Sequence, residues 1–222
     1  GRVSWDEADG SKVDIPAGHV RIYAGTDPPD TYGPFAPPDW IEARALREIE
    51  RQSAATLERT LVEGKPLSLS LVEALEQPRI EIRSLASRCL IPLGEFEPLL
   101  KELNDPQQYS YWVYGFASLR EAMQRGSHLE IKEVLERTRP IEAGDLYRLL
   151  QGYSPDQLAK GEADNLVRYL ESEQMDIRVL AFQNLYSITG AMEFYRPEKR
   201  PEGARSSIQN WKNRLAKGTI VY

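Results

Sequence analysis

Apolar and polar residues alternate in the first two dozen positions of the chain. Residues 3–5 and 13–15 form two such alternating runs, and an Asp-Gly pair at residues 9–10 separates them. This combination is typical of a β-hairpin. A third short apolar run occupies residues 20–22. The pattern therefore predicts a small β segment over residues 1–25, too small to be stable without packing on something else.

A proline-rich stretch follows the alternating runs. Residues 26–38 read TDPPDTYGPFAPP and contain five prolines. Proline disrupts helices and the central strands of sheets, so this stretch is predicted to be an extended connector. The connector marks a domain boundary, and a second domain is expected over residues 39–222.

From residue 39 onward the apolar residues recur at helical spacing, with regular start and stop signals. Five Ser or Asp residues are each followed three positions later by Glu or Gln, the sequence signature of a capping box. These predicted helix starts are Asp39, Ser70, Asp105, Ser127 and Ser154. Glycines at positions where a helix is expected to end are Gly64, Gly94, Gly126, Gly152 and Gly190. The second domain is therefore predicted to be all-α.

An internal repeat organises this helical region. Residues 71–93 align without a gap with residues 166–188, each 95 positions later, and nine positions are identical. The apolar residues of the second half of the first copy lie at i, i+3, i+4, i+7 and i+8, which is one face of an amphipathic helix. Each copy is predicted to be a short helix, a turn and a longer helix. The leucines expected to be buried are Leu75, Leu85, Leu90, Leu170, Leu180 and Leu185.

The repeat, with Ile-Arg followed by Leu-Ala in its second helix, resembles the HEAT repeat. The segments SLSLVEAL, SYWVYGFASL and DIRVLAFQNLYSITG are also similar to a family of HEAT-like repeat proteins of planctomycete bacteria. The opening DGSKVDIPAGHVRIY is similar to the end of FecR-type domains. The resemblance implies a right-handed helical-repeat solenoid over residues 39–222. It also implies the regulatory part of a cell-envelope signalling protein whose parent chain is membrane-anchored, and it leaves cytoplasm and periplasm both open.

The chain as a whole is acidic, whereas its C-terminal end is basic. The chain carries 28 Lys and Arg against 34 Asp and Glu, a net charge of −6. This balance argues against a nucleic-acid partner, including the alternative of a HEAT-like DNA glycosylase, which needs a basic concave face. Residues 196–222 carry a net positive charge, with seven Lys and Arg against two Glu. Arg196 and Arg200 there are candidates for binding an acidic partner, although a helix around Trp211 is expected to fold back as a cap on the last repeat.

Metal and cofactor chemistry have little support in the sequence. Cys89 is the single cysteine, and His19 and His128 are the two histidines. No cluster with the spacing of a metal site is present, and no phosphate-binding loop. Cys89 aligns with Asn184 in the other repeat copy and is predicted to be a small buried side chain. We expect no catalytic residue, no metal and no cofactor.

Aromatic side chains are the best candidates for a protein-binding surface. Tyr111 and Tyr114 are expected to face the core, which leaves Tyr109 and Trp112 toward another surface as contact anchors. The alternative for Trp112 is packing on the next repeat. The predicted function is a non-catalytic interaction or scaffold module that binds another protein. A sensor domain for a peptide or a carbohydrate is a further alternative.

Two arginines occupy equivalent positions in the repeat copies. Arg83 and Arg178 follow the isoleucine of each second helix. They are expected to bind carboxylates or helix-end carbonyls within the chain, with ligand binding as the alternative. Their predicted role is structural.

Overall fold

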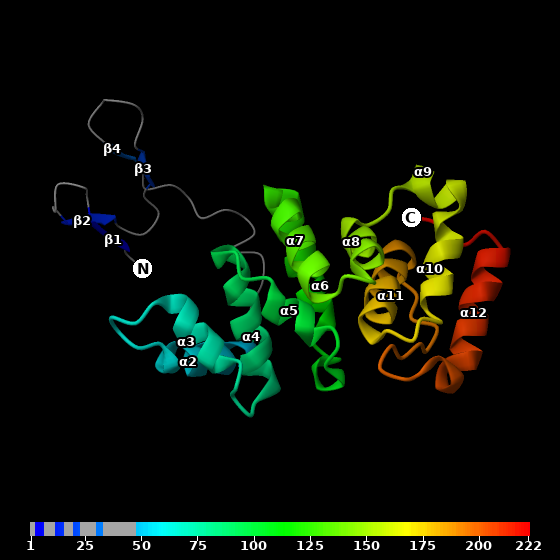
Figure 1. Ribbon diagram of the computed structural model, residues 1–222, viewed down its shortest axis with the longest axis horizontal. Coiled ribbons are helices and arrows are strands. Elements are labelled where there is room, and N and C mark those ends of the chain that lie inside the picture. Colours follow the sequence, from blue (N-terminus) through cyan, green and yellow to red (C-terminus); the bar gives the residue numbers. More distant parts are fainter. Residues whose placement is uncertain (1–2, 7–11, 16–19, 23–29, 33–47) are drawn as a thin grey trace. The chain divides into compact units, whose positions relative to one another are not determined.

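The computed structural model describes residues 3–6, 12–15, 20–22, 30–32 and 48–222 (Figure 1). The chain divides into two compact units, Gly1–Glu48 and Ile49–Tyr222. The helix start predicted at Asp39 lies outside the described residues.

The first unit contains two antiparallel strand pairs. Strand β1 (Val3–Asp6) pairs with β2 (Lys12–Ile15), and β3 (Val20–Ile22) pairs with β4 (Asp30–Tyr32). In the first pair Val3 lies opposite Ile15. The hairpin and the third strand are therefore present where the alternation predicts them.

The proline-rich stretch 26–38, for which an extended connector without helix or central strand is predicted, contains one short strand. Strand β4 lies within it and pairs with β3. Its three residues, Asp30–Tyr32, contain no proline, and Thr and Tyr both favour strands. The four residues between Pro29 and Pro34 are enough for a short edge strand, since such a strand needs few backbone donors.

The second unit is helical throughout, which confirms the predicted all-α class. Its helices are α2 (Glu48–Thr60), α3 (Leu67–Ala74), α4 (Ile80–Leu90), α5 (Glu97–Glu102), α6 (Trp112–Ala122), α7 (His128–Thr138), α8 (Ala143–Gln151), α9 (Pro155–Gln157), α10 (Ala163–Tyr169), α11 (Met175–Thr189) and α12 (Arg205–Ala216). Single helical turns connect them at Ile91–Leu93, Pro106–Gln108, Met123–Ser127, Leu158–Glu162 and Pro201–Ala204. Helix α3 packs on α4, α7 on α8, and α10 on α11. Helix α11 also contacts α6 and α8.

The predicted helix starts differ in their outcome. Ser154 forms a complete capping box with Gln157 at the start of α9. Asp105 accepts a hydrogen bond from the amide of Gln107. Ser127 precedes α7 but makes no capping bond. Ser70 is not a start, because Pro66 begins α3 earlier and leaves Ser70 buried inside the helix.

The two repeat copies form helix-turn-helix units, α3–α4 and α10–α11. Four of the six leucines predicted to be buried are fully so: Leu90, Leu170, Leu180 and Leu185. Leu75 and Leu85 are partly buried and pack against a small hydrophobic cluster of α2, α3 and α4. A larger cluster extends from Ile91 to Ile220 and forms the rest of the core.

Cys89 is exposed, so the prediction of a buried thiol is wrong. Its counterpart Asn184 is buried and donates hydrogen bonds to the carbonyls of Leu149 and Leu180. The difference arises because α11 has helices on several sides, whereas α4 lies near the start of the unit. Partial burial nevertheless raises the pKa of the Cys89 thiol, and the nearby Arg88 charge opposes this rise. A raised pKa makes Cys89 a poor nucleophile.

The C-terminal helix docks on the preceding repeat copy, as predicted. Trp211 and Ile208 are buried and α12 contacts α10. Lys212 reaches Glu171 at 2.8 Å, so part of the basic C-terminal charge is used within the chain. Among the described helices, none has both the length and the apolar character that crossing a bilayer requires.

Candidate functional site

A groove of about 380 Å³ brings together three of the four residues predicted to bind a partner. Tyr109, Trp112 and Arg196 all line it. The first two come from the start of α6 and the turn before it, and Arg196 comes from the segment that follows α11. The middle of α11 closes the groove with Phe182 and Tyr186. We call this feature the α6–α11 groove.

Trp112 is not the exposed anchor that the sequence predicts. Its side chain is only 3% exposed, and its indole Nε1 donates a hydrogen bond to the carbonyl of Glu102 at 2.9 Å. It forms part of the floor of the groove. The alternative, that Trp112 packs within the chain, is the one that holds.

The prediction for Trp112 was wrong because it assigned the wrong face of α6 to the core. Trp112, Phe116 and Leu119 face the core at i, i+4 and i+7. Tyr111 and Tyr114, which were expected inward, are only partly buried. Trp112 and Phe116 have one polar atom between them, the indole Nε1 of Trp112, and that atom has its hydrogen-bond partner in the carbonyl of Glu102.

The rim of the groove carries apolar side chains in contact with solvent. Tyr109 is 59% exposed, as predicted, and Met192 is 61% exposed. Val113 and Tyr186 are also exposed. Phe194, next to the groove in the chain, is 91% exposed. Large exposed apolar residues are ordinary when single, but a contiguous group of them marks an interaction surface.

The segment that carries Met192 and Phe194 is strained. Glu193 and Phe194 both have a left-handed backbone, with φ of 46° and 54°. Such angles are costly for residues with a side chain, and two in succession are rare. Strain of this kind persists only where the surrounding structure imposes it.

Three side chains hold this segment in place. The Tyr195 hydroxyl donates to the carbonyl of Leu170 at 2.7 Å. Arg178 is buried and donates through Nε to the carbonyl of Pro197 at 2.9 Å. Glu193 accepts a hydrogen bond from Arg214 of α12. The exposed apolar side chains are therefore presented by an anchored loop.

The basic candidates beside the groove are both exposed but differ in position. Arg196 uses its Nε to bind Glu198, and its two terminal nitrogens have no hydrogen bond among the described residues. Arg200 lies beyond the groove, so the structure does not bring it to the same site. Arg196, Lys199 and Arg200 share one short exposed turn.

Arg83 lies in a separate cleft between α3, α4 and α5, together with Glu102. Its Nη2 contacts Asp105 at 3.4 Å and Gln107 at 3.1 Å, so both repeat arginines bind groups within the chain, as the repeat predicts.

Burial raises the pKa of Glu102 to about 7, and this rise is opposed by a hydrogen bond with Ser87 and by the charge of Arg83.

Sequence analysis did not identify Met192, Phe194 or Tyr186 as parts of this site. The one available signal was a group of apolar residues, AMEFY, directly after the helix-ending Gly190 and before a basic stretch. Exposed apolar residues in a short loop have no periodicity, so the pattern of α-helices does not reveal them.

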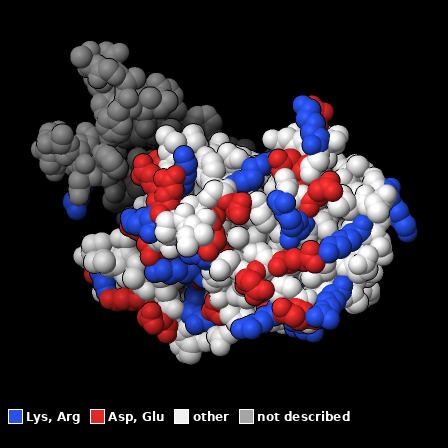
Figure 2. Space-filling view, turned by 45° about the vertical axis from the view of Figure 1, so that its right-hand side comes forward, with Lys and Arg blue, Asp and Glu red and all other residues white. Residues whose placement is uncertain are grey.

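The face of the molecule in Figure 2 shows basic and acidic side chains interspersed, without a continuous positive groove on that face. Within the part of the chain that the structure describes, no three His, Cys, Asp or Glu residues are grouped to hold a metal ion.

Comparison with protein-family models, with curated proteins and with solved structures gives no match to this chain.

Proposed function

We propose that Ile49–Tyr222 is a non-catalytic module that binds another protein through the α6–α11 groove. The occupant is an extended segment with a large apolar side chain next to a carboxylate. The observation that carries this proposal is the anchored, strained loop that holds Met192 and Phe194 in solvent beside the groove.

The apolar part of the occupant follows from the rim. Met192 and Tyr109 both line the groove, Met192 from the loop after α11 and Tyr109 from the turn before α6. Each would lose exposed surface to an inserted side chain, and apolar burial stabilises a complex by about 25 cal/mol per Å². Methionine adapts to different shapes, which suits a surface that binds a flexible segment.

The acidic part of the occupant follows from the charges beside the groove. Arg196 lines one end, and Lys199 and Arg200 lie in the same exposed turn. Glu198 pairs with Arg196 but leaves its terminal nitrogens available in the described residues. A carboxylate on the partner would meet these nitrogens in the two-pronged geometry that arginine favours.

The proposal includes a HEAT-like, right-handed solenoid as the scaffold. Two units with the same helix-turn-helix order support it, α3–α4 and α10–α11. The colours of Figure 1 run in chain order from α2 at one end of this unit to α12 at the other. Stacked repeats create extended surfaces suited to binding. An experimental structure in which successive helical pairs turn with the opposite hand would contradict this part. Membership of a cell-envelope signalling protein stays a prediction of the resemblance.

Selection from a random peptide library tests the groove. Peptides selected on the wild-type protein are expected to combine a large apolar residue with Asp or Glu. Met192→Asp places a charge on the apolar rim and should weaken the selected peptides by about tenfold or more. Ile141→Asp is the matched control, because Ile141 is 90% exposed outside the groove.

Two results would contradict the proposal. One is a set of selected peptides that bind Met192→Asp and the wild type equally well. The other is equal weakening by Met192→Asp and Ile141→Asp, which would point to a general effect of added charge. Circular dichroism of both variants establishes that they remain folded.

A further inference from the structure

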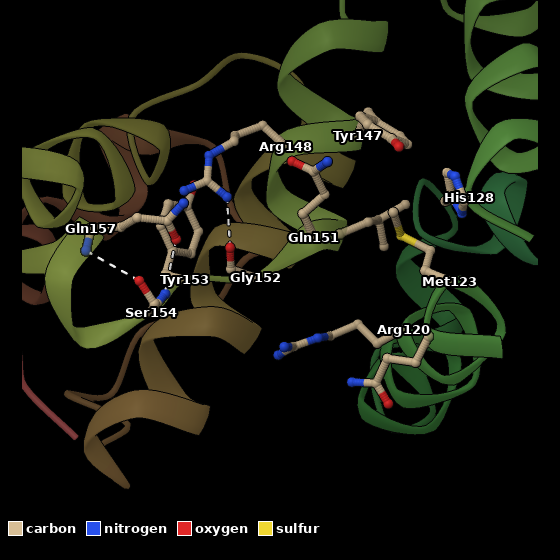
Figure 3. A pocket seen from close by; sticks show the side chains of 12 residues that line it. Arg120, Met123, His128, Tyr147, Arg148, Gln151, Gly152, Tyr153, Ser154 and Gln157 are labelled. Carbon is tan, nitrogen blue, oxygen red and sulfur yellow. Dashed lines mark hydrogen bonds between the residues drawn. The ribbon is translucent and has the colours of Figure 1, made fainter. Parts of the chain in front are cut away.

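A second cleft, of about 610 Å³, lies between α6, α8 and the segment that follows α8 (Figure 3). Its size suits a small molecule. Arg120 of α6 and Arg148 of α8 both line it, together with Gly152, Tyr153, Ser154 and Gln157 of the segment after α8. It shares no lining residue with the α6–α11 groove.

Arg148 is held rigidly in this cleft. Its guanidinium donates to the carbonyl of Gly152 at 2.6 Å and lies 4.0 Å above the ring of Tyr153. The Nη2 atom of Arg148 and the hydroxyl of Tyr153 are buried without a hydrogen-bond partner in the described part of the chain. Buried polar atoms without partners are costly and uncommon, and they often mark sites where a ligand or water supplies the missing bond.

Arg120 approaches the same residue from the other helix. A Cβ atom placed on Gly152 would lie only 2.4 Å from Nη2 of Arg120. Gly152 also has a φ of 77°, a left-handed backbone that favours glycine whatever the space around it. Figure 3 shows Arg120 extending across the cleft toward Gly152. Within the described residues, the guanidinium of Arg120 has no hydrogen bond or ion pair.

The cleft contains positive charge without negative charge. Asp and Glu outnumber Lys and Arg in this chain, yet the lining holds no carboxylate. The two acids that act on Tyr153 are Asp145 and Glu162, which bind Tyr169 and Asn165 instead. Two guanidinium groups that converge on one glycine repel each other unless an anion lies between or beside them.

We infer that this cleft binds a small molecule through an oxyanion, either a carboxylate or a phosphate. Arg120 contacts the oxyanion directly, because its guanidinium has no hydrogen bond within the described residues and the residue is only partly buried. Arg148 adds a fixed positive charge, held by Gly152 and Tyr153. Met123 and Tyr147 supply apolar contact for the rest of the molecule, and Gln151 at the end of α8 supplies an amide.

Titration of the isotope-labelled full chain with three ring compounds tests this inference. Benzoate and phenyl phosphate carry the two oxyanions, and benzyl alcohol carries neither. We expect saturable shifts of the Gly152 amide and the Arg120 Nε–H signals with at least one of the two anions. Saturation by benzoate alone assigns a carboxylate ligand, and saturation by phenyl phosphate alone assigns a phosphate. Benzyl alcohol is expected to give no saturable shift.

Variants separate this cleft from general surface charge. Arg120→Gln should weaken binding of the saturating anion by about tenfold or more, because it removes a charged pair. Arg125→Gln is the control, since Arg125 lies just beyond α6 and pairs with Glu121 outside the cleft. Gln151→Glu places a negative charge in the cleft without removing packing, and should weaken binding to a similar extent.

Three outcomes would overturn the inference. They are the absence of saturation by either anion, an equal response to benzyl alcohol, and equal weakening by Arg120→Gln and Arg125→Gln. If Arg120→Gln fails to fold, Gln151→Glu decides the question. Met192→Asp should leave anion binding unchanged, which keeps this test independent of the α6–α11 groove.

Discussion

The Nε atom of Arg178 lies 2.9 Å from the carbonyl oxygen of Pro197, and this bond ties the buried start of α11 to the loop beside the groove. The same guanidinium donates through Nη1 to the carbonyls of Ser172 and Glu173, at 2.7 and 2.9 Å, in the turn after α10. One side chain thus fixes both ends of a segment that includes the strained loop. Arg83, its counterpart in the other repeat copy, has fewer and longer contacts.

The two repeat arginines should therefore differ in their effect on stability. Arg178→Ala removes a buried guanidinium that donates to three backbone carbonyls, one of them in a buried bond, and should lower the free energy of unfolding by about 3 kcal/mol. Arg83→Ala should cost less than about 1 kcal/mol, because its ion pair is partly exposed and long. Urea denaturation of both variants measures the difference. Equal losses would contradict the structural ranking, and unchanged stability with lost peptide binding would favour a direct binding role for these arginines.

The repeat was predictable because it depends on apolar spacing. The identities between residues 71–93 and 166–188 gave the helix-turn-helix units and four fully buried leucines. The spacing did not decide which side of α6 faces the core, because Trp112 and Tyr111 belong to two equally regular stripes. The buried indole of Trp112 donates a hydrogen bond to the carbonyl of Glu102, ten residues earlier, and the apolar spacing alone does not show this bond.

The conformation of the loop beside the groove could not be predicted from the sequence, for a different reason. Left-handed angles at Glu193 and Phe194 have no local cause, since neither residue favours them. They depend on tertiary contacts at Arg178, Tyr195 and Arg214. The single clue in the sequence was Gly190, which ends α11 with a φ of 67° and turns the chain toward the groove.

Asp176 is the centre of a buried polar cluster that links three parts of the second unit. Asn104 donates to its carboxylate at 2.9 Å, and Arg139, after α7, forms an ion pair with it. Asp176→Ala would leave Arg139 without its main partner. We expect the free energy of unfolding to fall by about 3 to 5 kcal/mol, the range for breaking a buried pair from one side.

A matched substitution tests whether charge causes this loss. Asp176→Asn keeps the volume and a hydrogen-bond acceptor but removes the charge, so it should recover part of the stability. Thermal and urea denaturation compare the two variants. A loss below about 1 kcal/mol for Asp176→Ala would show that the cluster contributes little beyond packing.

Glu102 should make stability depend on pH. Burial raises its pKa in the folded protein to about 7, above the ordinary value of 4.5. Between these two values the unfolded chain has released the proton while the folded protein still holds it. Stability due to Glu102 is therefore fully present below about pH 4.5, falls as the pH rises, and is lost above about pH 7. The total loss is up to about 3 kcal/mol.

Glu102→Gln should remove this dependence, because an amide does not ionise. The variant is expected to gain stability relative to the wild type between pH 5 and pH 8, as measured by urea denaturation at each pH. Glu133→Gln, on the exposed face of α7, is the control and should follow the wild-type profile. Parallel profiles for wild type and Glu102→Gln would contradict the raised pKa.

Phe194→Gly should separate stability from binding. Phe194 is almost fully exposed, so little packing is lost, and glycine adopts a φ of 54° without strain. The relief of strain exceeds the entropy that glycine adds to the unfolded chain, so we expect a gain of about 0.5 to 1 kcal/mol. Binding of the selected peptides should weaken, because an apolar contact beside the groove is removed.

Ile141→Gly is the control for this gain. Ile141 is as exposed as Phe194 and also lies in a turn, but its φ is not left-handed. The same loss of side chain there should lower stability, because the cost in chain entropy is not offset by relieved strain. If Phe194→Gly also lowers stability, the left-handed angle at Phe194 carries no cost. The residues of the loop would then favour this conformation by themselves. The strain, which is the observation that supports the groove as a binding site, would be absent.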